Sequence, residues 1–373
     1  MSDTTAAVER LDGPITHTHI GGQAVLEGVM MRGKFNWAVA VRTPDGSIHT
    51  ETHDLTSAAA KHGWMKKPVI RGVVALVETL ALAMKAFEIS ASMAGETEDE
   101  QLSGKEIALS MGLGLALAVG LFIVAPALLT NWMVGSAAEK PFQWNVVDGI
   151  LRVAAFFIYI WAISRIPDIQ RVFAYHGAEH KTIHAYEHGL PLDSDVIQRY
   201  STQHMRCGTS FLLMVMIVAI FVFSFVPVRA IAAGLGFDNR IGVLAIAILS
   251  RIILLPLVAG LAYEITVKWA GNHSDNPVVK ALLWPGLQLQ RMTTREPEDE
   301  MVEVAVASMK LVIEREEREE AIARGEDPDA GAAAEETEAT DAPEGSDATS
   351  AEPGAPEEPA KDPAAEQPAD AAV

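Results

Sequence analysis

Four long runs of apolar residues dominate the hydropathy pattern of this chain. They cover residues 107–133, 146–166, 210–228 and 241–263. A helix that crosses the hydrocarbon core of a bilayer needs roughly 20 apolar residues, and each run meets or nearly meets that length. The stretch Leu115–Leu129 has no polar face, whereas helices of soluble proteins are usually amphipathic. The pattern therefore predicts a mainly α-helical, polytopic membrane protein with about four transmembrane helices.

The N-terminal region predicts a small β-containing unit over residues 16–67, after an unstructured stretch at 1–15. Residues 37–42 and 47–53 are β-prone and flank a Pro-Asp-Gly turn, which is typical of a hairpin. Four glycines between Gly21 and Gly33 indicate tight turns or close backbone approach. Residues 68–93 predict an interfacial or re-entrant helix, because charged residues interrupt its apolar face.

The C-terminal region divides into a polar segment and an acidic tail. Residues 264–324 are polar, with helical character from 298 to 324. Residues 325–373 carry a net charge of −14, which leaves only −6 of the total of −20 for the rest of the chain. This tail has no aromatic residue and cannot bury enough apolar surface to offset the entropy of ordering, so we expect it to be disordered.

The distribution of Lys and Arg predicts the orientation in the membrane. The 134–145 and 229–240 loops hold one and two such residues, whereas the 165–209 loop holds five and residues 264–324 hold eight. Because positively charged loops stay on the cytoplasmic side, both termini and the 165–209 loop should be cytoplasmic. The N-terminus lacks the apolar segment of a signal peptide, and a plasma-membrane protein inserted through its internal helices is expected.

A histidine-rich segment lies within the predicted cytoplasmic region 167–209. The sequence His-x-x-Glu-His occurs twice, at 176–180 and at 184–188. On a helix, His176, His180, His184 and Glu187 fall on one stripe, at about 100° per residue. Two imidazoles spaced i and i+4 can chelate one metal ion, and an intervening glutamate can act as a general base. The pattern predicts a divalent metal site, with zinc as the expected ion and Glu179 as the catalytic base.

One metal ion cannot use the whole stripe, because residues i and i+8 are about 12 Å apart along a helix. The segment therefore holds either one site with spare histidines or two neighbouring sites. A further ligand must come from elsewhere in the chain. The candidate metal ligands are His176, His180, His184, Glu187, His188, His204, Cys207 and Glu264. The alternative is an interfacial helix whose histidines and glutamates hydrogen-bond to one another and to lipid headgroups, or a proton relay.

Several segments together resemble the bacterial DUF1385 (YqhQ-like) membrane proteins. The segments that carry the resemblance are 21–33, 176–187, 206–211 and 290–297. The resemblance covers about residues 20–310 and implies a metal-dependent enzyme, without naming a reaction. This chain departs from the family at Met205, where the family usually has proline between the histidine and the arginine. That change loosens the turn before the third apolar run and puts the placement of His204 in doubt.

Two functions are consistent with these patterns. The first is a membrane-bound, metal-dependent hydrolase that faces the cytoplasm and acts on a peptide, a lipid headgroup or a phosphoester. The second is a non-enzymatic membrane factor that binds another membrane protein or assists its assembly, with the histidine stripe in a structural role. The bilayer is the expected partner in both. Nucleic-acid binding is not expected, because the chain has no basic stripe with interleaved aromatic residues.

Overall fold

A computed structural model describes most of the chain. The described residues are 18–55, 62–95, 104–135, 139–205, 207–237, 239–270, 273 and 276–326. The predictions for residues 1–15, and for the tail beyond residue 326, lie outside this range. Within it the protein is mainly helical, with a small antiparallel sheet near the N-terminus, as the sequence predicts.

The sheet contains strands β1 (Gly21–Val25), β2 (Gly28–Arg32), β3 (Asn36–Arg42) and β4 (Ile48–Asp54), paired antiparallel in sequence order. The hairpin predicted around the Pro-Asp-Gly turn is confirmed, with Val41 opposite His49. The glycine-rich segment, predicted to contain tight turns or close backbone approach, forms two strands of the sheet. Gly28 is one of its close-approach glycines, because a Cβ atom there would collide with the carbonyl oxygen of Ala40.

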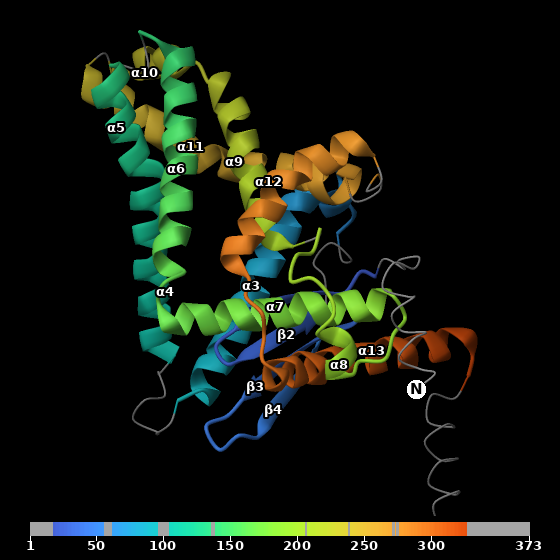
Figure 1. The fold of residues 1–373 in the computed structure, drawn as a ribbon. Helices are drawn as coiled ribbons and strands as arrows, with labels where there is room; N and C mark the ends of the chain where they lie inside the picture. The colour runs from blue at the N-terminus through green and yellow to red at the C-terminus, as the bar shows by residue number, and fades with distance from the viewer. Residues whose placement is uncertain are drawn as a thin grey trace, which may run out of the picture. The chain divides into compact units, whose positions relative to one another are not determined.

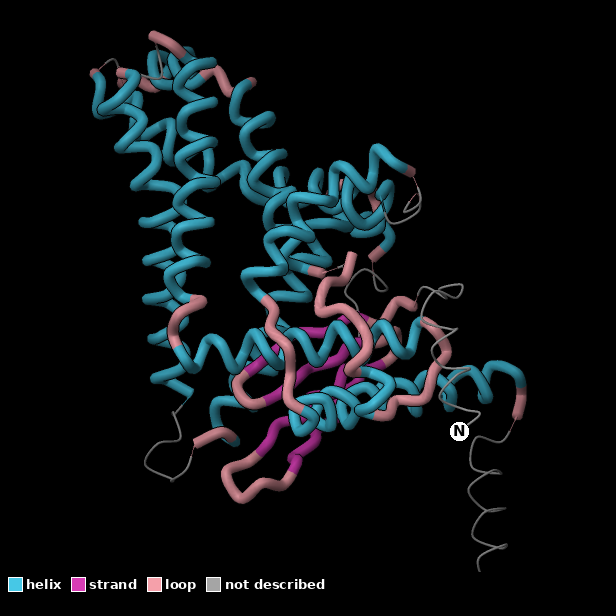
Figure 2. Tube along the Cα trace, in the orientation of Figure 1, coloured by secondary structure: helices cyan, strands magenta, loops and turns pink. Residues whose placement is uncertain are grey.

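Each face of the sheet packs against different helices. Alternate residues of a strand point to opposite faces, so Met31 and Ala38 turn to a core shared with α7 (Pro167–Glu187) and α13 (Asp299–Arg324). Trp37 and Val39 turn to a core that includes Leu82 and Ala86 of α3 (Ile70–Met93). Figures 1 and 2 show α7 and α13 side by side across the strands. The sheet is thus covered on both faces by helices from distant parts of the sequence.

Within the described part of the chain, three helices are long and apolar enough to cross a membrane, or up to four if the bent pair counts as one span. The three spans are Leu109–Val134, Pro141–Ile163 and Arg240–Ala270. The first joins α4 (Gly104–Val119) to α5 (Ala125–Val134) through a π-helical stretch, the second is α6, and the third extends α11 (Arg240–Tyr263) by a π-helical stretch. The bent pair is α9 (Gly208–Ser224) and α10 (Val228–Gly234), with a 58° bend. The 229–240 segment, predicted as a loop, therefore contains a helix.

Another helix, α12 (Pro277–Thr293), was not predicted. Residues 264–324 were predicted from the sequence to be a polar segment with helical character only from residue 298. Asn276 caps the N-terminus of α12 by accepting from the amide of Val278, 2.8 Å away. The helix contains Pro285 in its interior, a residue that normally interrupts helices. It packs on α9, where Gly286 lies so close to Ser210 that an added Cβ would be 2.6 Å from the Ser210 hydroxyl oxygen. This contact brings α12 to the histidine-bearing region.

The histidine-rich segment is a regular helix, α7, of 21 residues. Pro167 stands at its first turn with Asp168, and both residue types favour a helix N-terminus. The helix ends before Gly189, which has a φ of 64°, the left-handed conformation that glycine adopts most readily. Short helix α8 (Ser194–Ile197) follows. The predicted helical stripe of histidines is therefore present.

Candidate metal centre

One face of α7 is fixed by the sheet, which leaves the histidine stripe to meet other segments. Tyr175, Ala178 and Ile183 belong to the core shared with the strands and α13. Residues 201–207, between α8 and α9, and the last turn of α12 lie on the histidine side, because each supplies hydrogen-bond partners to these rings. Burial of one face thus determines where the imidazoles point.

His176, His180 and Cys207 form a first group that could hold a metal ion. One ligand atom from each lies within 4.8 Å of the others. Nε2 of His176 is 3.2 Å from the Cys207 sulfur. The two imidazole rings are one helical turn apart and their centroids are separated by 4.3 Å. Cys207, 31 residues from His176 in the sequence, is thus the third member that the sequence left open among several candidates.

The remaining ring nitrogens of this pair are held by backbone carbonyls. Nδ1 of His176 is 2.8 Å from the carbonyl oxygen of Thr293, and Nδ1 of His180 is 2.5 Å from that of Thr202. A carbonyl only accepts, so each Nδ1 carries the proton and each Nε2 keeps its lone pair. Nε2 of His180 is buried without a well-formed hydrogen bond. Metal-binding histidines are usually oriented in this way, with the second ring nitrogen donating to a carbonyl or carboxylate.

Glu179 lies beside the first group and is buried. Its Oε2 has no hydrogen-bond partner among the described residues. Burial raises the pKa of the Glu179 carboxyl to about 8, while His176 and the Gly22 amide act to lower it and Cys207 acts to raise it. The side chain lies directly on β1, where a Cβ added to Gly22 would be 2.7 Å from Cγ of Glu179. The glycine of β1 therefore provides the space that this carboxyl occupies.

His184, Glu187 and His204 form a second group, again with ligand atoms within 4.8 Å of one another. Nε2 of His204 is 3.2 Å from Oε2 of Glu187, and Nε2 of His184 is 2.9 Å from the carbonyl oxygen of Gln203. Oε1 of Glu187 also accepts from the amide of Thr18 at 3.3 Å. This group is more deeply buried than the first, since both Glu187 and His204 are inaccessible to solvent.

The backbone around His204 is fixed by α12. The side-chain amide of Gln290 accepts from the His204 amide and donates to the His204 carbonyl, both at 2.8 Å. It also donates to the hydroxyl of Ser210 at 2.9 Å. The sequence left the placement of His204 in doubt, because Met205 stands where the resembled family usually has proline. The hydrogen bonds from Gln290 of α12 fix the backbone at His204 despite this change.

The two groups are neighbours. The ring of His204 lies 4.7 Å from that of His184 and 5.7 Å from that of His180, centroid to centroid. The pattern of two adjacent groups corresponds to the two His-x-x-Glu-His repeats, each completed by a residue from the 201–207 segment. Two arrangements are compatible with this pattern. Either one group holds a metal ion while the other is held together by hydrogen bonds, or each group holds a metal ion.

The surroundings lower the pKa values of His180, His204 and Cys207. Burial lowers the pKa of His180, and burial lowers the pKa of His204 to about 4. Burial also acts to raise the pKa of the Cys207 thiol, but the neighbouring His180 and Thr209 side chains lower it by more. Neutral imidazole and thiolate are the forms that bind metal ions. The electrostatics therefore suit metal ligands at neutral pH.

Two of the predicted ligands do not join either group among the described residues. Nδ1 of His188 is 2.7 Å from the carbonyl oxygen of His184, and its ring packs 5.0 Å from that of Tyr200. Glu264 instead accepts two hydrogen bonds from the guanidinium of Arg71, and one from the amide of Val69 at 3.1 Å. That ion pair holds α3 to the end of α11 and engages both carboxylate oxygens of Glu264.

Comparison with known proteins identifies the family. Residues 67–315 match the family described as "Protein of unknown function (DUF1385)". The chain belongs to the DUF1385 family. It is also 34% identical over 314 residues to "Uncharacterized protein YqhQ" of Bacillus subtilis (strain 168), covering 79% of this chain and 92% of that relative. No solved structure matches the chain.

These matches confirm the resemblance seen in the sequence but assign no chemistry. The family description and the relative's name state no activity, metal or substrate. The metal-dependent activity that the resemblance implied therefore gains no support from them. The matched range includes both histidine groups and the long apolar helices, and it leaves out strands β1 to β4 and the acidic tail.

Proposed function

We propose that this DUF1385 protein is a membrane-embedded, metal-dependent hydrolase whose metal is held by His176, His180 and Cys207. The observation that carries the proposal is the orientation of the two imidazoles. Both Nδ1 atoms donate to backbone carbonyls, so both Nε2 atoms are left for a ligand beside the Cys207 thiol. A hydrogen-bonded histidine cluster without a metal does not require Nε2 of His180 to be buried without a partner.

The donor set favours zinc. Two imidazoles and one thiolate are borderline-soft ligands of the kind that zinc prefers. Catalytic zinc sites commonly use three protein ligands and keep a fourth position for water or substrate. His176 and Cys207 are only partly buried, whereas His180 is fully buried. The open position would therefore lie on the side of His176 and Cys207.

Glu179 is the candidate general base. Its carboxyl lies within the electrostatic influence of His176 and Cys207, and its Oε2 is free of protein hydrogen bonds among the described residues. A zinc ion bound there would supply Lewis acidity and positive charge. The positive charge would also favour the ionised form of the Glu179 carboxyl, whose pKa burial raises to about 8 in the metal-free site. Ionised Glu179 would then take a proton from the attacking water and deliver it to the leaving group, the role of an intervening glutamate in the inverted zinc-protease motif.

The membrane location of the site is part of the same proposal. The apolar helices α6 and α9 directly precede α7 and directly follow Cys207. The Lys/Arg distribution places the polar ends of these helices, both termini and the histidine groups on the cytoplasmic side. A site at that boundary suits a substrate presented at the membrane surface. Peptide, lipid headgroup and phosphoester remain the candidate classes.

The experiment is elemental analysis of the full-length protein, purified in detergent at neutral pH without chelator. Wild type should hold stoichiometric zinc, and His176→Ala, His180→Ala and Cys207→Ser should each lose it. His188→Ala is the matched control on the same helix, because His188 belongs to neither group, and it should retain the metal. Glu179→Gln should also retain it but should lose about 10²–10⁴-fold in any hydrolytic rate.

The same measurement separates one metal from two. If one ion is bound, His184→Ala leaves the content of wild type unchanged. If two are bound, wild type holds twice as much and His184→Ala removes half. A wild-type protein that carries no metal would overturn the proposal, and a membrane assembly factor that binds another membrane protein would then be the better hypothesis. A metal that is bound without any effect of Glu179→Gln on turnover would favour a structural role.

A further inference from the structure

A cluster of buried charged residues lies outside the two histidine groups, where α6, α9 and α11 pack together. Asp148, Arg152 and Arg251 are 2%, 8% and 1% exposed. Both guanidinium groups contact the same carboxylate oxygen, since Oδ2 of Asp148 is 3.0 Å from Nη2 of Arg152 and 3.3 Å from Nε of Arg251. The ring of Phe223 on α9 completes the site, 5.0 Å from the guanidinium carbon of Arg251. Three candidate spans thus contribute to one polar site.

The charges of this group do not balance. Two guanidinium groups face one carboxylate, and Asp148 is the single acidic residue in the sequences of α6, α9 and α11. Arg251 also donates to the side-chain oxygen of Asn145 at 2.9 Å and to the carbonyl of Ala247 at 2.7 Å, but both acceptors are neutral. A buried charge without a counter-charge is strongly unfavourable, so one negative charge is missing from the site.

Two buried polar atoms in the same place have no hydrogen-bond partner among the residues that the structure describes. Oδ1 of Asp148 is an unused acceptor, and Nε1 of Trp144 is an unused donor. The two residues are one turn apart on α6, so they lie on the same face of the helix. The Trp144 ring is 1% exposed and lies 4.6 Å from the guanidinium carbon of Arg251. An acceptor, a donor and excess positive charge therefore occur together.

We propose that this cluster binds a small oxyanion that keeps an O–H group, such as phosphate or hydrogen carbonate. The oxygens of the ion would accept from Arg152 and from the Trp144 indole, and its O–H would donate to Oδ1 of Asp148. The unused carboxylate oxygen gives the specificity: sulfate has no proton to offer at neutral pH, and it would place an oxygen lone pair against Asp148. A buried polar group left unpaired in this way discriminates strongly between otherwise similar ligands.

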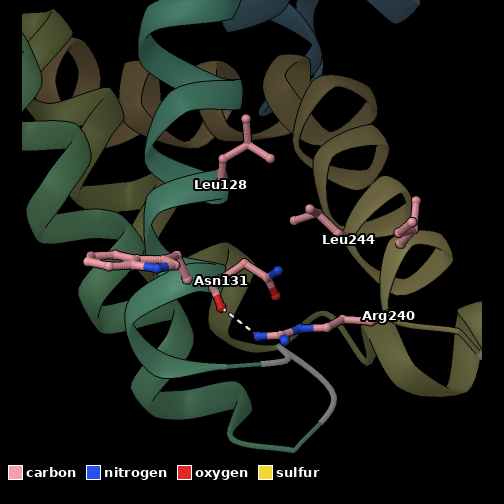
Figure 3. Close-up of a pocket in the computed structure, with 6 residues that line it drawn as sticks. Leu128, Asn131, Arg240 and Leu244 are labelled. Atoms are coloured by element: carbon pink, nitrogen blue, oxygen red, sulfur yellow. Dashed lines mark hydrogen bonds between the residues drawn. The ribbon is translucent and has the colours of Figure 1, made fainter.

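A pocket on the same side of α11 offers an approach. It is lined by Leu128, Asn131 and Trp132 of α5 and by Arg240, Ile241 and Leu244 of α11, with an empty volume of about 600 Å³. Figure 3 shows Arg240 reaching across to the carbonyl of Asn131, 2.9 Å away. Leu244 and Arg251 are seven residues apart and share one face of α11, about two turns from each other. The pocket and Arg251 of the cluster therefore lie on the same face of α11, about two turns apart.

The test uses the full-length protein in detergent, treated with chelator so that the histidine groups hold no metal. Its melting temperature is followed by tryptophan fluorescence during titration with sodium phosphate or with sodium sulfate at equal ionic strength. Phosphate at a hundredfold excess over its Kd should raise the melting temperature by about 5 °C, and sulfate should not. Because metal is absent, this outcome does not depend on whether the proposed hydrolase function is correct.

Two variants assign the response to the cluster. Trp144→Phe keeps the ring beside Arg251 but removes the indole N–H, and it should weaken phosphate binding at least tenfold. Trp132→Phe, at an 80% exposed tryptophan of α5, is the matched control and should respond like wild type. Arg152→Gln balances the buried charge, so it should abolish the phosphate response while the phosphate-free protein melts no lower than wild type.

Four results would overturn the proposal. An equal rise with phosphate and sulfate would indicate a general salt effect, and a full phosphate response in Trp144→Phe and Arg152→Gln would place the ion elsewhere. A response to short-chain phosphatidic acid but not to inorganic phosphate would identify a lipid headgroup as the occupant. Absence of any response, together with a large loss of stability in Arg152→Gln, would mean that the cluster is a structural ion pair hydrated by water.

Discussion

Glu179→Gln in metal-free protein should change how stability depends on pH. In the folded protein, burial raises the pKa of this carboxyl from 4.5 to about 8. Between these values the folded state keeps a proton that the unfolded state releases. The wild-type protein therefore loses stability as the pH rises from about 5 to 8, and the glutamine variant lacks this contribution because it cannot titrate.

The magnitude follows from the two pKa values. Each tenfold change in a proton-binding constant corresponds to about 1.4 kcal/mol. Between pH 5 and pH 8, the unfolding free energy of wild type should fall by about 3 kcal/mol relative to that of the variant. This is less than the full difference between the two pKa values would give, because part of the change already exists at pH 5. For a protein of this size the corresponding change in melting temperature is about 6 °C.

The comparison with the variant is necessary because a neighbouring histidine titrates in the opposite sense. Burial lowers the pKa of His204 to about 4, so its unfolded form takes up a proton first and stability falls as the pH decreases from about 6.5 to 4. The pH profile of wild type contains both contributions. Subtracting the profile of Glu179→Gln removes the histidine part, which is common to both proteins.

The assay is thermal unfolding in detergent with excess chelator, followed by tryptophan fluorescence at pH 5, 6, 7 and 8. With each step from pH 5 to pH 8, the stability of the variant should rise relative to that of wild type. The stability difference in favour of the variant should therefore be larger at pH 8 than at pH 5. Glu303→Gln, at a carboxylate whose side chain is 61% exposed, serves as the control and should parallel wild type. Parallel profiles for wild type and Glu179→Gln would show that the carboxyl is solvated, and the burial of the site would then be refuted.

Three further predictions concern packing, topology and the tail. Gly22→Ala should destabilise the protein by about 1–3 kcal/mol in thermal or denaturant unfolding, because the Cβ of the introduced alanine would press on Glu179. Gly21→Ala is the control, because there is open space at this position, and it should change stability by less than about 0.5 kcal/mol. In a background without the native cysteine, Glu139→Cys should react with an impermeant thiol reagent on intact cells and Asp195→Cys should not; the reverse pattern would invert the proposed topology. Deletion of residues 325–373 should leave the melting temperature within about 2 °C of wild type, because this composition buries little apolar area, and a large decrease would show that the tail docks on the folded body.

Periodicity and local turn chemistry were sufficient to predict many elements of this protein. The apolar runs form long helices, the structure in which a chain of that length would satisfy its backbone hydrogen bonds inside a bilayer. The Pro-Asp-Gly turn became the β3–β4 hairpin, and the spacing of His176, His180 and His184 placed their rings on one side of α7. Each of these features depends on residues within a few positions of one another, and the sequence contains that information directly.

Features with mixed local signals were predicted less well. The glycines of residues 21–33 indicated turns, but pairing with β3 extends this segment into two strands. Pro285 argues against a helix, yet packing on α9 outweighs that preference and α12 forms around it. Helix and strand propensities amount to about 1 kcal/mol for most residues and to about 3 kcal/mol for a proline inside a helix, so burial against a neighbouring element can override them.

The identity of the site depended on contacts between distant residues. The sequence left Cys207, His204 and Glu264 open as candidates to complete the metal site. The fold brings His204 and Cys207 to the histidines of α7, while Arg71, 193 positions before Glu264, engages the third. In the same way, Asp148 and Arg152 are one turn apart in the sequence, but only the packing of α11 against α6 adds the second guanidinium of Arg251. The sequence alone predicted which side chains are candidate ligands and which helix face they share; the tertiary structure decided their partners, because hydrogen bonds and ion pairs form between atoms that only folding brings within about 3 Å.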